Sequence, residues 1–391
     1  MYLPTPRRSS VPRRSSDSVI PLTATIKLPV SQDDKGPIPQ TLPYAPIHQI
    51  GRTGFSFKFI KLLHAIGCKT ASLPSSDRTE CVRSAYLFTK LLRLANQDNI
   101  YLKDLHDSDL QTPRSQELGI GMLCLFAREY WKIPWDALEP IPGKGRRFDY
   151  RGKAKGLKAI FEAKGTRHRK NQSKQIADGL SKKKAHHKRG EKYDVELIIS
   201  THIGGIRDRS RLLLADPEFP DDGFSFGPKA DDFFRLRHYA RVLHFAGAPS
   251  LGYQLRQEAD LIYKSARGLP FPFADTLMVR SFPRRPDVPR TLSEHTAGGS
   301  LFMGTWYDSW LPPREDDPQD ADFINIKLQE FQPAIKVFQG IRAELVQGIE
   351  KQGPLSILDN ANLDAPETVL EAGPLVSSIF SDGSILSLQY L

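Results

Sequence analysis

The stretch that decides the fold spans residues 146–165 and reads RRFDYRGKAKGLKAIFEAKG. It contains two strand-like runs, residues 146–152 and 157–165, which are joined through a Gly-Lys-Ala-Lys-Gly turn. Glycines on both sides of a short polar turn favour a hairpin, in which the second run folds back on the first. The sequence therefore predicts two neighbouring strands at this point of the chain.

The second run carries an acid and a base on one face. Side chains alternate along a strand, so Glu162 and Lys164 project from the same side. In the predicted hairpin Asp149 lies across from residues 159–162, within reach of Glu162 where the two share a face. Two carboxylates beside an ammonium on a basic surface suit a divalent cation that holds a phosphodiester.

The basic charge of the chain is concentrated around this stretch. The net charge is +10, and the window 143–192 alone holds 18 Lys or Arg against 4 Asp or Glu. This leaves 37 of the 55 basic residues and 41 of the 45 acidic residues for the rest of the chain. A charge excess confined to one segment indicates a polyanion that binds at that segment.

Length and composition are those of an ordinary globular protein with room for two or three domains. The 391 residues are 39% hydrophobic and 26% charged. Three widely spaced cysteines, Cys68, Cys81 and Cys124, give neither a disulfide framework nor paired zinc ligands. No run approaches the roughly 18 apolar residues of a membrane span. The sequence predicts a protein of the reducing cytoplasm that does not enter a membrane.

The segments around the hairpin alternate between helical and strand-like patterns. Helices are expected over residues 115–130 and 171–188, and further strands over residues 135–141, 195–199 and 211–215. The order is helix, strand, the hairpin, helix, strand, strand. This order is typical of an α/β layer arrangement.

An aspartate on one strand, Glu-x-Lys on the next, then a glutamine-bearing basic helix and a buried strand resemble the PD-(D/E)XK nuclease superfamily. The resemblance covers about residues 113–203, with Asp149 in the place of the motif aspartate and residues 162–164 as the Glu-x-Lys. Phe148 replaces the proline that usually precedes the aspartate. The resemblance implies an α/β, restriction-endonuclease-like fold, which has a mixed sheet flanked by helices.

The resemblance also implies a metal-dependent active site. Asp149 and Glu162 would hold Mg²⁺, with Mn²⁺ as a substitute. Lys164 would orient the attacking water or stabilise the transition state. It would act as a base only if its pKa were strongly depressed.

Two helices contribute further candidates. Gln175, with Gln172 as the alternative, matches the glutamine often found in the helix after Glu-x-Lys, and would position water or a phosphate oxygen. Glu117 matches a catalytic, metal-binding acid that some members supply from the first helix, and a capping role at the helix amino terminus suits it equally. The residues expected to contact nucleic acid are Arg147, Arg151, Arg167, Arg169, Lys170, Lys182, Lys183 and Lys184.

Four regions are expected along the chain. Residues 1–46, rich in Pro, Arg and Ser, predict a flexible leader, and residues 47–105 predict a helical extension. Residues 106–225 form the predicted nuclease-like domain. Residues 226–391 predict a separate region, mainly α or α+β, with no recognised motif.

The leading hypothesis is an Mg²⁺-dependent deoxyribonuclease, a hydrolase of phosphodiester bonds that acts in defence against foreign DNA, in a mobile element or in repair. Its expected partners are DNA and other subunits of a multi-protein system. The alternative is a non-catalytic nucleic-acid-binding or scaffold protein that retains the fold. A nuclease for RNA is a third hypothesis.

Overall fold

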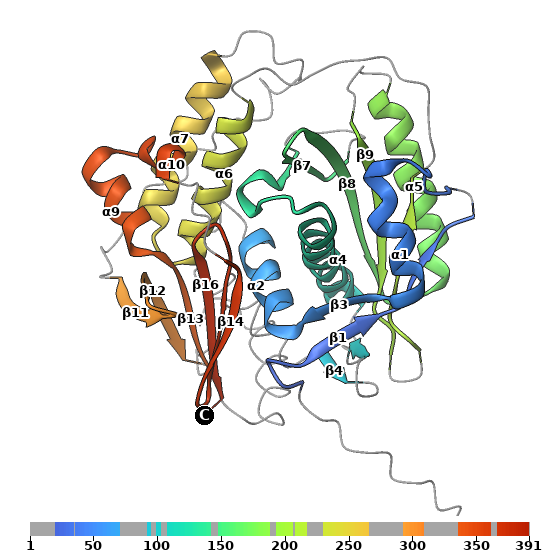
Figure 1. Cartoon of the computed structure of the whole chain (residues 1–391), viewed down its shortest axis with the longest axis horizontal. Helices are drawn as coiled ribbons and strands as arrows, with labels where there is room; N and C mark the ends of the chain where they lie inside the picture. The colour runs from blue at the N-terminus through green and yellow to red at the C-terminus, as the bar shows by residue number, and fades with distance from the viewer. Residues whose placement is uncertain are drawn as a thin grey trace, which may run out of the picture.

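The computed structural model shows a mixed α/β protein with two six-stranded sheets and helices packed on them (Figure 1). The mixed α/β class expected from the sequence is confirmed. The residues that the structure describes are 20–34, 36–70, 92–94, 99–102, 108–141, 148–187, 193–205, 208–216, 230–265, 292–308, 335–360 and 366–390.

The first sheet contains the predicted hairpin. Its strands lie in the order β2-β10-β9-β8-β7-β6. The pairs β8 with β9 and β2 with β10 are parallel, and the other neighbours are antiparallel, so the sheet is mixed as expected. The strand bounds are β2 Val30–Gln32, β6 Glu139–Pro140, β7 Tyr150–Ala154, β8 Leu157–Thr166, β9 Val195–His202 and β10 Arg211–Ala215.

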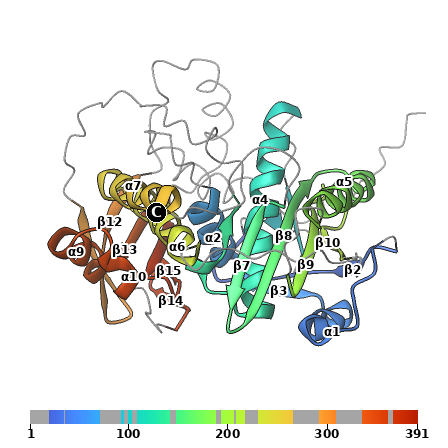
Figure 2. The same cartoon turned by 90° about the horizontal axis from the view of Figure 1, so that it is seen from above.

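Two long helices, α4 Ser108–Trp131 and α5 Lys170–His187, cover opposite faces of this sheet, which Figure 2 shows from above. Along β8, Phe161 packs into the core shared with α4, whereas Ile160 packs with Ile176 of α5. Because side chains alternate along a strand, Glu162 lies on the same side of the sheet as Ile160, which is the side covered by α5. Both helices predicted for this part of the chain are confirmed.

The close packing of α4 on β8 depends on two glycines. A Cβ on Gly165 would lie 1.5 Å from the carbonyl oxygen of Ser115. A Cβ on Gly119 would lie 2.8 Å from the carbonyl oxygen of Lys164. Only a residue without a side chain fits at these positions, so α4 crosses directly over the end of the strand that carries the Glu-x-Lys.

The amino-terminal region contains more β-structure than expected. The flexible leader predicted through residue 46 is wrong for the described residues from 20 onward, because Ile26 and Leu28 are buried and β2 forms one edge of the first sheet. Phe55 and Phe57 alternate with exposed residues and pair with β1, so this part of the predicted helical extension is a strand. The elements are β1 Thr25–Leu28, a 3-10 turn Leu42–Tyr44, α1 Ala45–Thr53, β3 Phe55–Lys58, α2 Phe59–Thr70, β4 Leu92–Leu94 and β5 Ile100–Leu102.

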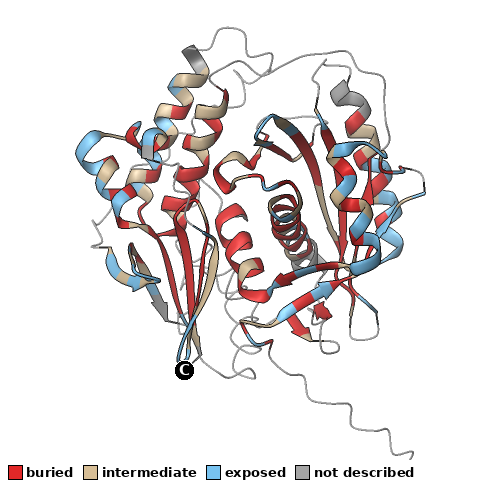
Figure 3. Cartoon of the chain, in the orientation of Figure 1, coloured by how far each residue is buried: buried red, intermediate tan, exposed pale blue. Residues whose placement is uncertain are grey.

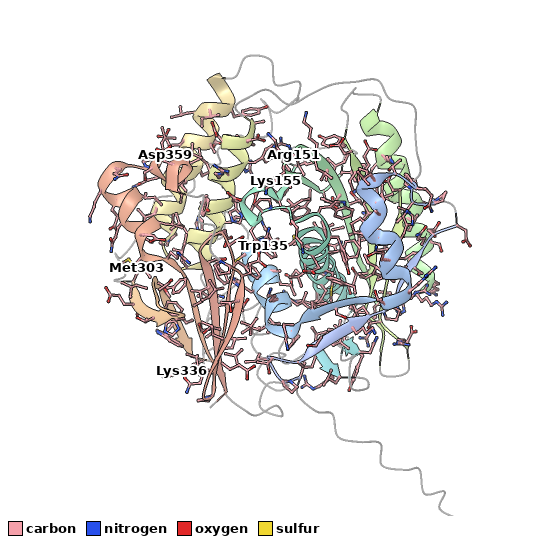
Figure 4. The ribbon with its side chains drawn as sticks, in the orientation of Figure 1. Trp135, Arg151, Lys155, Met303, Lys336 and Asp359 are labelled. Carbon is pink, nitrogen blue, oxygen red and sulfur yellow. The ribbon has the colours of Figure 1, made fainter. Side chains whose placement is uncertain are left out.

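The strand predicted over residues 135–141 is mostly wrong. Residues Trp135–Ala137 form a 3-10 turn, and only the two residues of β6 pair with β7. The ring of Trp135, labelled in Figure 4, stacks on Phe380 with 4.0 Å between ring centroids. Aromatic packing against the carboxyl-terminal region therefore determines this segment, which sequence pattern alone does not reveal.

The carboxyl-terminal region is α+β, and it shares a core with the first sheet. Figure 3 shows α2 and α4 largely buried, and residues of α2 belong to one hydrophobic cluster with Phe245 and Phe380. The antiparallel second sheet has the order β11-β12-β13-β16-β15-β14. Its elements are α6 Ala230–Phe245, α7 Pro249–Ser265, β11 Ser293–Ala297, β12 Ser300–Asp308, β13 Ile335–Arg342, α9 Ala343–Gln352, α10 Ser356–Asn360, β14 Thr368–Ala372, β15 Leu375–Ile379 and β16 Ser384–Tyr390. Across the ranges given above, no helix is long and apolar enough to cross a membrane.

A buried polar network joins the two sheets. The ammonium of Lys69 on α2 lies 3.1 Å from Glu139 Oε1 and 3.0 Å from His238 Nδ1. His238 Nε2 lies 2.7 Å from Asp382 Oδ2, and Arg241 pairs with Glu139. Two cations and two carboxylates balance when His238 is neutral, and burial lowers the pKa of His238. The network thus holds α2, β6, α6 and the β15–β16 turn together at little net charge.

A second buried histidine makes the stability of the fold depend on pH. His64 stacks on Phe380 at 3.8 Å between ring centroids, and burial lowers its pKa from 6.5 to about 3. The unfolded chain therefore binds a proton at His64 more readily than the folded chain does. The part of the folding free energy that depends on neutral His64 is complete above pH 6.5 and is lost progressively as pH falls toward 3. Between pH 6.5 and pH 5 the wild type is expected to lose about 2 kcal/mol more than His64→Gln. Urea denaturation at both pH values measures this difference, and equal losses would contradict it.

Candidate active site

The hairpin register brings Asp149 opposite Glu162. Tyr150 pairs with Phe161, and the main-chain N–H of Asp149 donates to the carbonyl of Phe161 at 3.0 Å. The Asp149 carboxylate accepts a hydrogen bond of 3.1 Å from the main-chain N–H of Ala163. The predicted placement of the two acids is confirmed, although β7 extends to residue 154 and the turn is shorter than expected.

The turn itself needs two residues only. Lys155, labelled in Figure 4, and Gly156 have φ values of 22° and 83°. Positive φ at both central residues is typical of the two-residue hairpin turn that matches strand twist. This tight connection fixes the register of the hairpin, and with it the position of Asp149 relative to Glu162.

Glu162 is the most buried group of the site. Its side chain is 0% exposed, and its Oε1 lies 2.8 Å from the Nζ of Lys164 and 2.5 Å from the Nζ of Lys182. Its Oε2 is buried, with no hydrogen-bond partner among the described residues. Burial raises the pKa of Glu162 to about 7, and the charge of Asp149 adds to the rise. A buried carboxylate with an unsatisfied oxygen is costly to keep unless it serves a ligand.

Lys164 is an ammonium held between two acids. Its Nζ lies 2.8 Å from Glu162 Oε1 and 3.0 Å from Asp178 Oδ2. Burial alone would lower the pKa of Lys164, but the charge of Glu162 and the hydrogen bonds to both acids outweigh it, so the pKa is raised. The condition for Lys164 to act as a base, a depressed pKa, is therefore not met.

Lys182 lies inside the site. It was expected among the residues that contact nucleic acid, and its Nζ lies 2.5 Å from Glu162 Oε1 and 3.7 Å from Asp149 Oδ1. Asp178, which the sequence interpretation missed, stands one helical turn before it on α5 and pairs with Lys164. Spacing of four residues on a helix predicts a common face, and this was the available signal for Asp178.

Gln175 and Gln172 hold the sheet together. Gln175 donates to the carbonyl of Gly165 at 3.0 Å and accepts from the hydroxyl of Ser200 at 2.7 Å. Gln172 donates to the carbonyl of Ser200 at 2.9 Å and accepts from Arg211 at 2.8 Å. Both amides thus link α5 to strands of the first sheet next to Lys164, and this position suits a support for the site more than a contact with water.

Glu117 is engaged elsewhere. Both of its carboxylate oxygens lie 2.8 Å from the guanidinium of Arg114, one turn earlier on α4. The neighbouring Ser115 and Gly119 contact β8 from the face opposite to α5, and Glu117 points away from that contact by helical spacing. The expected third acid is not brought to Asp149 and Glu162.

Two of the predicted phosphate contacts are buried side chains that form ion pairs within the protein. Arg151 on β7 lies 2.8 Å from Asp231 at the start of α6, and its side chain is 7% exposed. Lys183 pairs with Asp216 and lies 3.2 Å from Glu196, and its side chain is 4% exposed. These partners and this burial leave neither side chain available to a phosphate, so their predicted role is wrong in this structure.

The remaining predicted contacts differ in exposure. Arg169 and Lys170 are exposed at the start of α5, where the helix dipole also favours an anion. Arg167 is half-buried and donates to a main-chain carbonyl of β5. The predictions for Arg147 and for the side chain of Lys184 lie outside the described residues.

The donor set fits a hard divalent cation. No group of three or more His, Cys, Asp or Glu residues that could hold a metal ion is found within the described ranges. Mg²⁺ does not need such a group, because it is commonly bound through one or two carboxylates, with waters and phosphate oxygens completing its shell. Asp149 and Oε2 of Glu162, which has no hydrogen-bond partner among the described residues, offer this set.

Comparisons with known proteins do not assign a family. Compared with models of protein families, with curated proteins and with solved structures, the chain gives no match. The cluster of Asp149, Glu162, Lys164 and Lys182 is therefore the basis for a function.

Proposed function

We propose that this protein is a metal-dependent nuclease that hydrolyses phosphodiester bonds of DNA. The observation that carries the proposal is the buried Glu162, which lies beside Asp149 and Lys164 and has one oxygen without a partner among the described residues. The order α4, hairpin, α5 and parallel β9 supports a restriction-endonuclease-like fold. The window 143–192 holds 18 basic and 4 acidic residues, an excess of 14 positive charges, which supports a polyanionic substrate.

The roles of the residues follow from their environment. Asp149 and Glu162 would hold the cation through carboxylate oxygens. Bound Mg²⁺ lowers the pKa of a bound water and offsets the charge that develops on the phosphate. Lys164, whose pKa is raised, stays charged and places positive charge near the phosphate instead of accepting a proton. Gln175 and Gly165 keep the strand that carries Lys164 in position.

Cleavage of supercoiled plasmid and of linear DNA tests the proposal. The wild type is expected to cut in Mg²⁺ or Mn²⁺ and to be inactive in EDTA. Asp149→Ala and Lys164→Ala are each expected to lose about a hundredfold or more of the rate, since each removes charge from the reacting centre. Single-stranded RNA as a competitor separates the two kinds of nucleic acid.

Equal activity of the wild type and both variants would contradict the assignment. Salt-sensitive binding of DNA without cleavage in either metal would favour the alternative, a non-catalytic DNA-binding protein. The observation that favours this alternative is Lys182, whose ammonium already neutralises the two acids.

A further inference from the structure

The ammonium of Lys182 stands where a cation shared by Asp149 and Glu162 would stand. It lies 2.5 Å from Glu162 Oε1 and 3.7 Å from Asp149 Oδ1, and it thus forms ion pairs with both acids. Lys164 approaches the same Oε1 at 2.8 Å and is held on its other side by Asp178. Glu162 Oε1 therefore serves two ammonium groups, whereas the buried Oε2 serves none of the described residues.

The neighbouring Lys183 forms buried ion pairs and provides a comparison within the same helix. Lys183 pairs with Asp216 and Glu196, and its side chain is 4% exposed. The side chain of Lys182 is 18% exposed, and that of Asp149 is 36% exposed. A lysine ammonium on a flexible four-carbon stem can withdraw to solvent from a site that borders water. The ammonium of Lys182 can therefore reach solvent, whereas the buried ammonium of Lys183 cannot.

A divalent cation and the Lys182 ammonium exclude each other at this position. Like charges a few Å apart repel strongly when the surrounding protein screens them poorly. The ammonium also pairs with one oxygen of each acid, Glu162 Oε1 and Asp149 Oδ1, so a cation that bridges the two carboxylates would meet it there. Binding of the cation therefore requires Lys182 to leave, and the free energy of its ion pairs is subtracted from the affinity.

We propose that Lys182 is a built-in competitor of the divalent cation, which occupies the position between Asp149 and Glu162 and sets the metal concentration that the site needs. This inference deepens the proposed function and rests on it only for the choice of a divalent cation. Lys182 is a regulating residue in this scheme, and Lys164, fixed by Glu162 and Asp178, remains in place when the cation binds.

Binding of Mn²⁺ to the full chain without DNA measures the competition. Electron paramagnetic resonance of free Mn²⁺ gives the dissociation constant for the wild type and for four variants. Lys182→Met and Lys182→Gln are expected to bind Mn²⁺ about tenfold more tightly or better, because they lack the competing charge. Lys182→Arg keeps the charge and is expected to stay near the wild type. Lys174→Met, an exposed lysine of the same helix, is the matched control and is expected to stay within about twofold.

The outcomes separate this inference from the proposed function. Equal or weaker Mn²⁺ binding by Lys182→Met and Lys182→Gln overturns the inference, as does the absence of Mn²⁺ binding in the whole set. A gain that Lys182→Arg shares also overturns it, because packing would then be the cause. Tighter binding by the two neutral variants, together with no cleavage of DNA, upholds the competition and contradicts the nuclease.

Discussion

Glu162→Gln is expected to abolish metal-dependent cleavage of DNA, lowering the rate by about a thousandfold or more. The substitution keeps the shape of the side chain and removes its charge. An amide cannot balance a divalent cation, and its nitrogen replaces one of the two oxygens that the site offers. Glu162 supplies one of the two carboxylates of the site, so the substitution leaves Asp149 as the remaining carboxylate for the cation.

The fold is expected to survive this change. Lys164 keeps its pair with Asp178, and Lys182 keeps the longer pair with Asp149. Glu162 has a pKa raised to about 7, so its ionised form costs stability that accumulates as pH rises through 4.5 to 7, and the neutral amide avoids this cost. Melting followed by circular dichroism is therefore expected to give a Tm for the variant at pH 7.5 that is no lower than that of the wild type.

Glu196→Gln is the matched control. Glu196 is a buried glutamate on the neighbouring strand β9, and it lies 3.2 Å from Lys183 of α5 just as Glu162 contacts Lys182. This variant is expected to retain cleavage within a few-fold of the wild type. Loss of cleavage in both variants, or in neither, would contradict the assignment of Glu162 as a metal-binding group.

Gly165→Ala is expected to destabilise the protein by about 3–5 kcal/mol, or to prevent folding. The new Cβ would lie 1.5 Å from the carbonyl oxygen of Ser115 and 2.3 Å from its carbonyl carbon. Both atoms belong to the main chain of α4, which cannot rotate away as a side chain can. The helix would have to move off β8, which would also displace Lys164 and Glu162.

Gly51→Ala is the control for this prediction. Gly51 lies in α1, and a Cβ there meets no atom within 4 Å. Alanine in a helix restricts the unfolded chain, so this variant is expected to gain about 0.4–1 kcal/mol. Urea denaturation of the three proteins measures both changes. A Gly165→Ala protein as stable as Gly51→Ala would show that α4 does not lie against β8 as described.

The elements around the site could be predicted because their patterns are local. The hairpin is marked by a glycine turn between two runs of alternating residues, and the structure has β7 and β8 there. The apolar run at residues 195–199 falls in β9, and Arg211–Ala215 is β10. Neighbouring side chains in a strand or helix determine such patterns, so they survive in the sequence without the rest of the fold.

The placement of groups from distant elements could not be predicted in the same way. β2 is three residues long, and only its pairing with β10 at the sheet edge makes it a strand. Glu117 was expected near the metal and pairs with Arg114 instead. Lys183 and Lys182 are adjacent and chemically alike, yet one is sealed in a pair with Asp216 and the other borders solvent. Burial depends on how the helices and sheets pack together, and the type of a residue alone does not determine it.

By itself, the sequence determined the mixed α/β class, the hairpin, and the meeting of Asp149 with Glu162, because period-two alternation and a tight turn specify register over a few residues. Only the tertiary structure decided which charges face each other. It places α5 over β8, so that Lys182 and Asp178 join the acids and Glu162 loses contact with water. The physical reason is that ion pairing and pKa depend on distances between elements, which follow from how side chains of the whole layer pack.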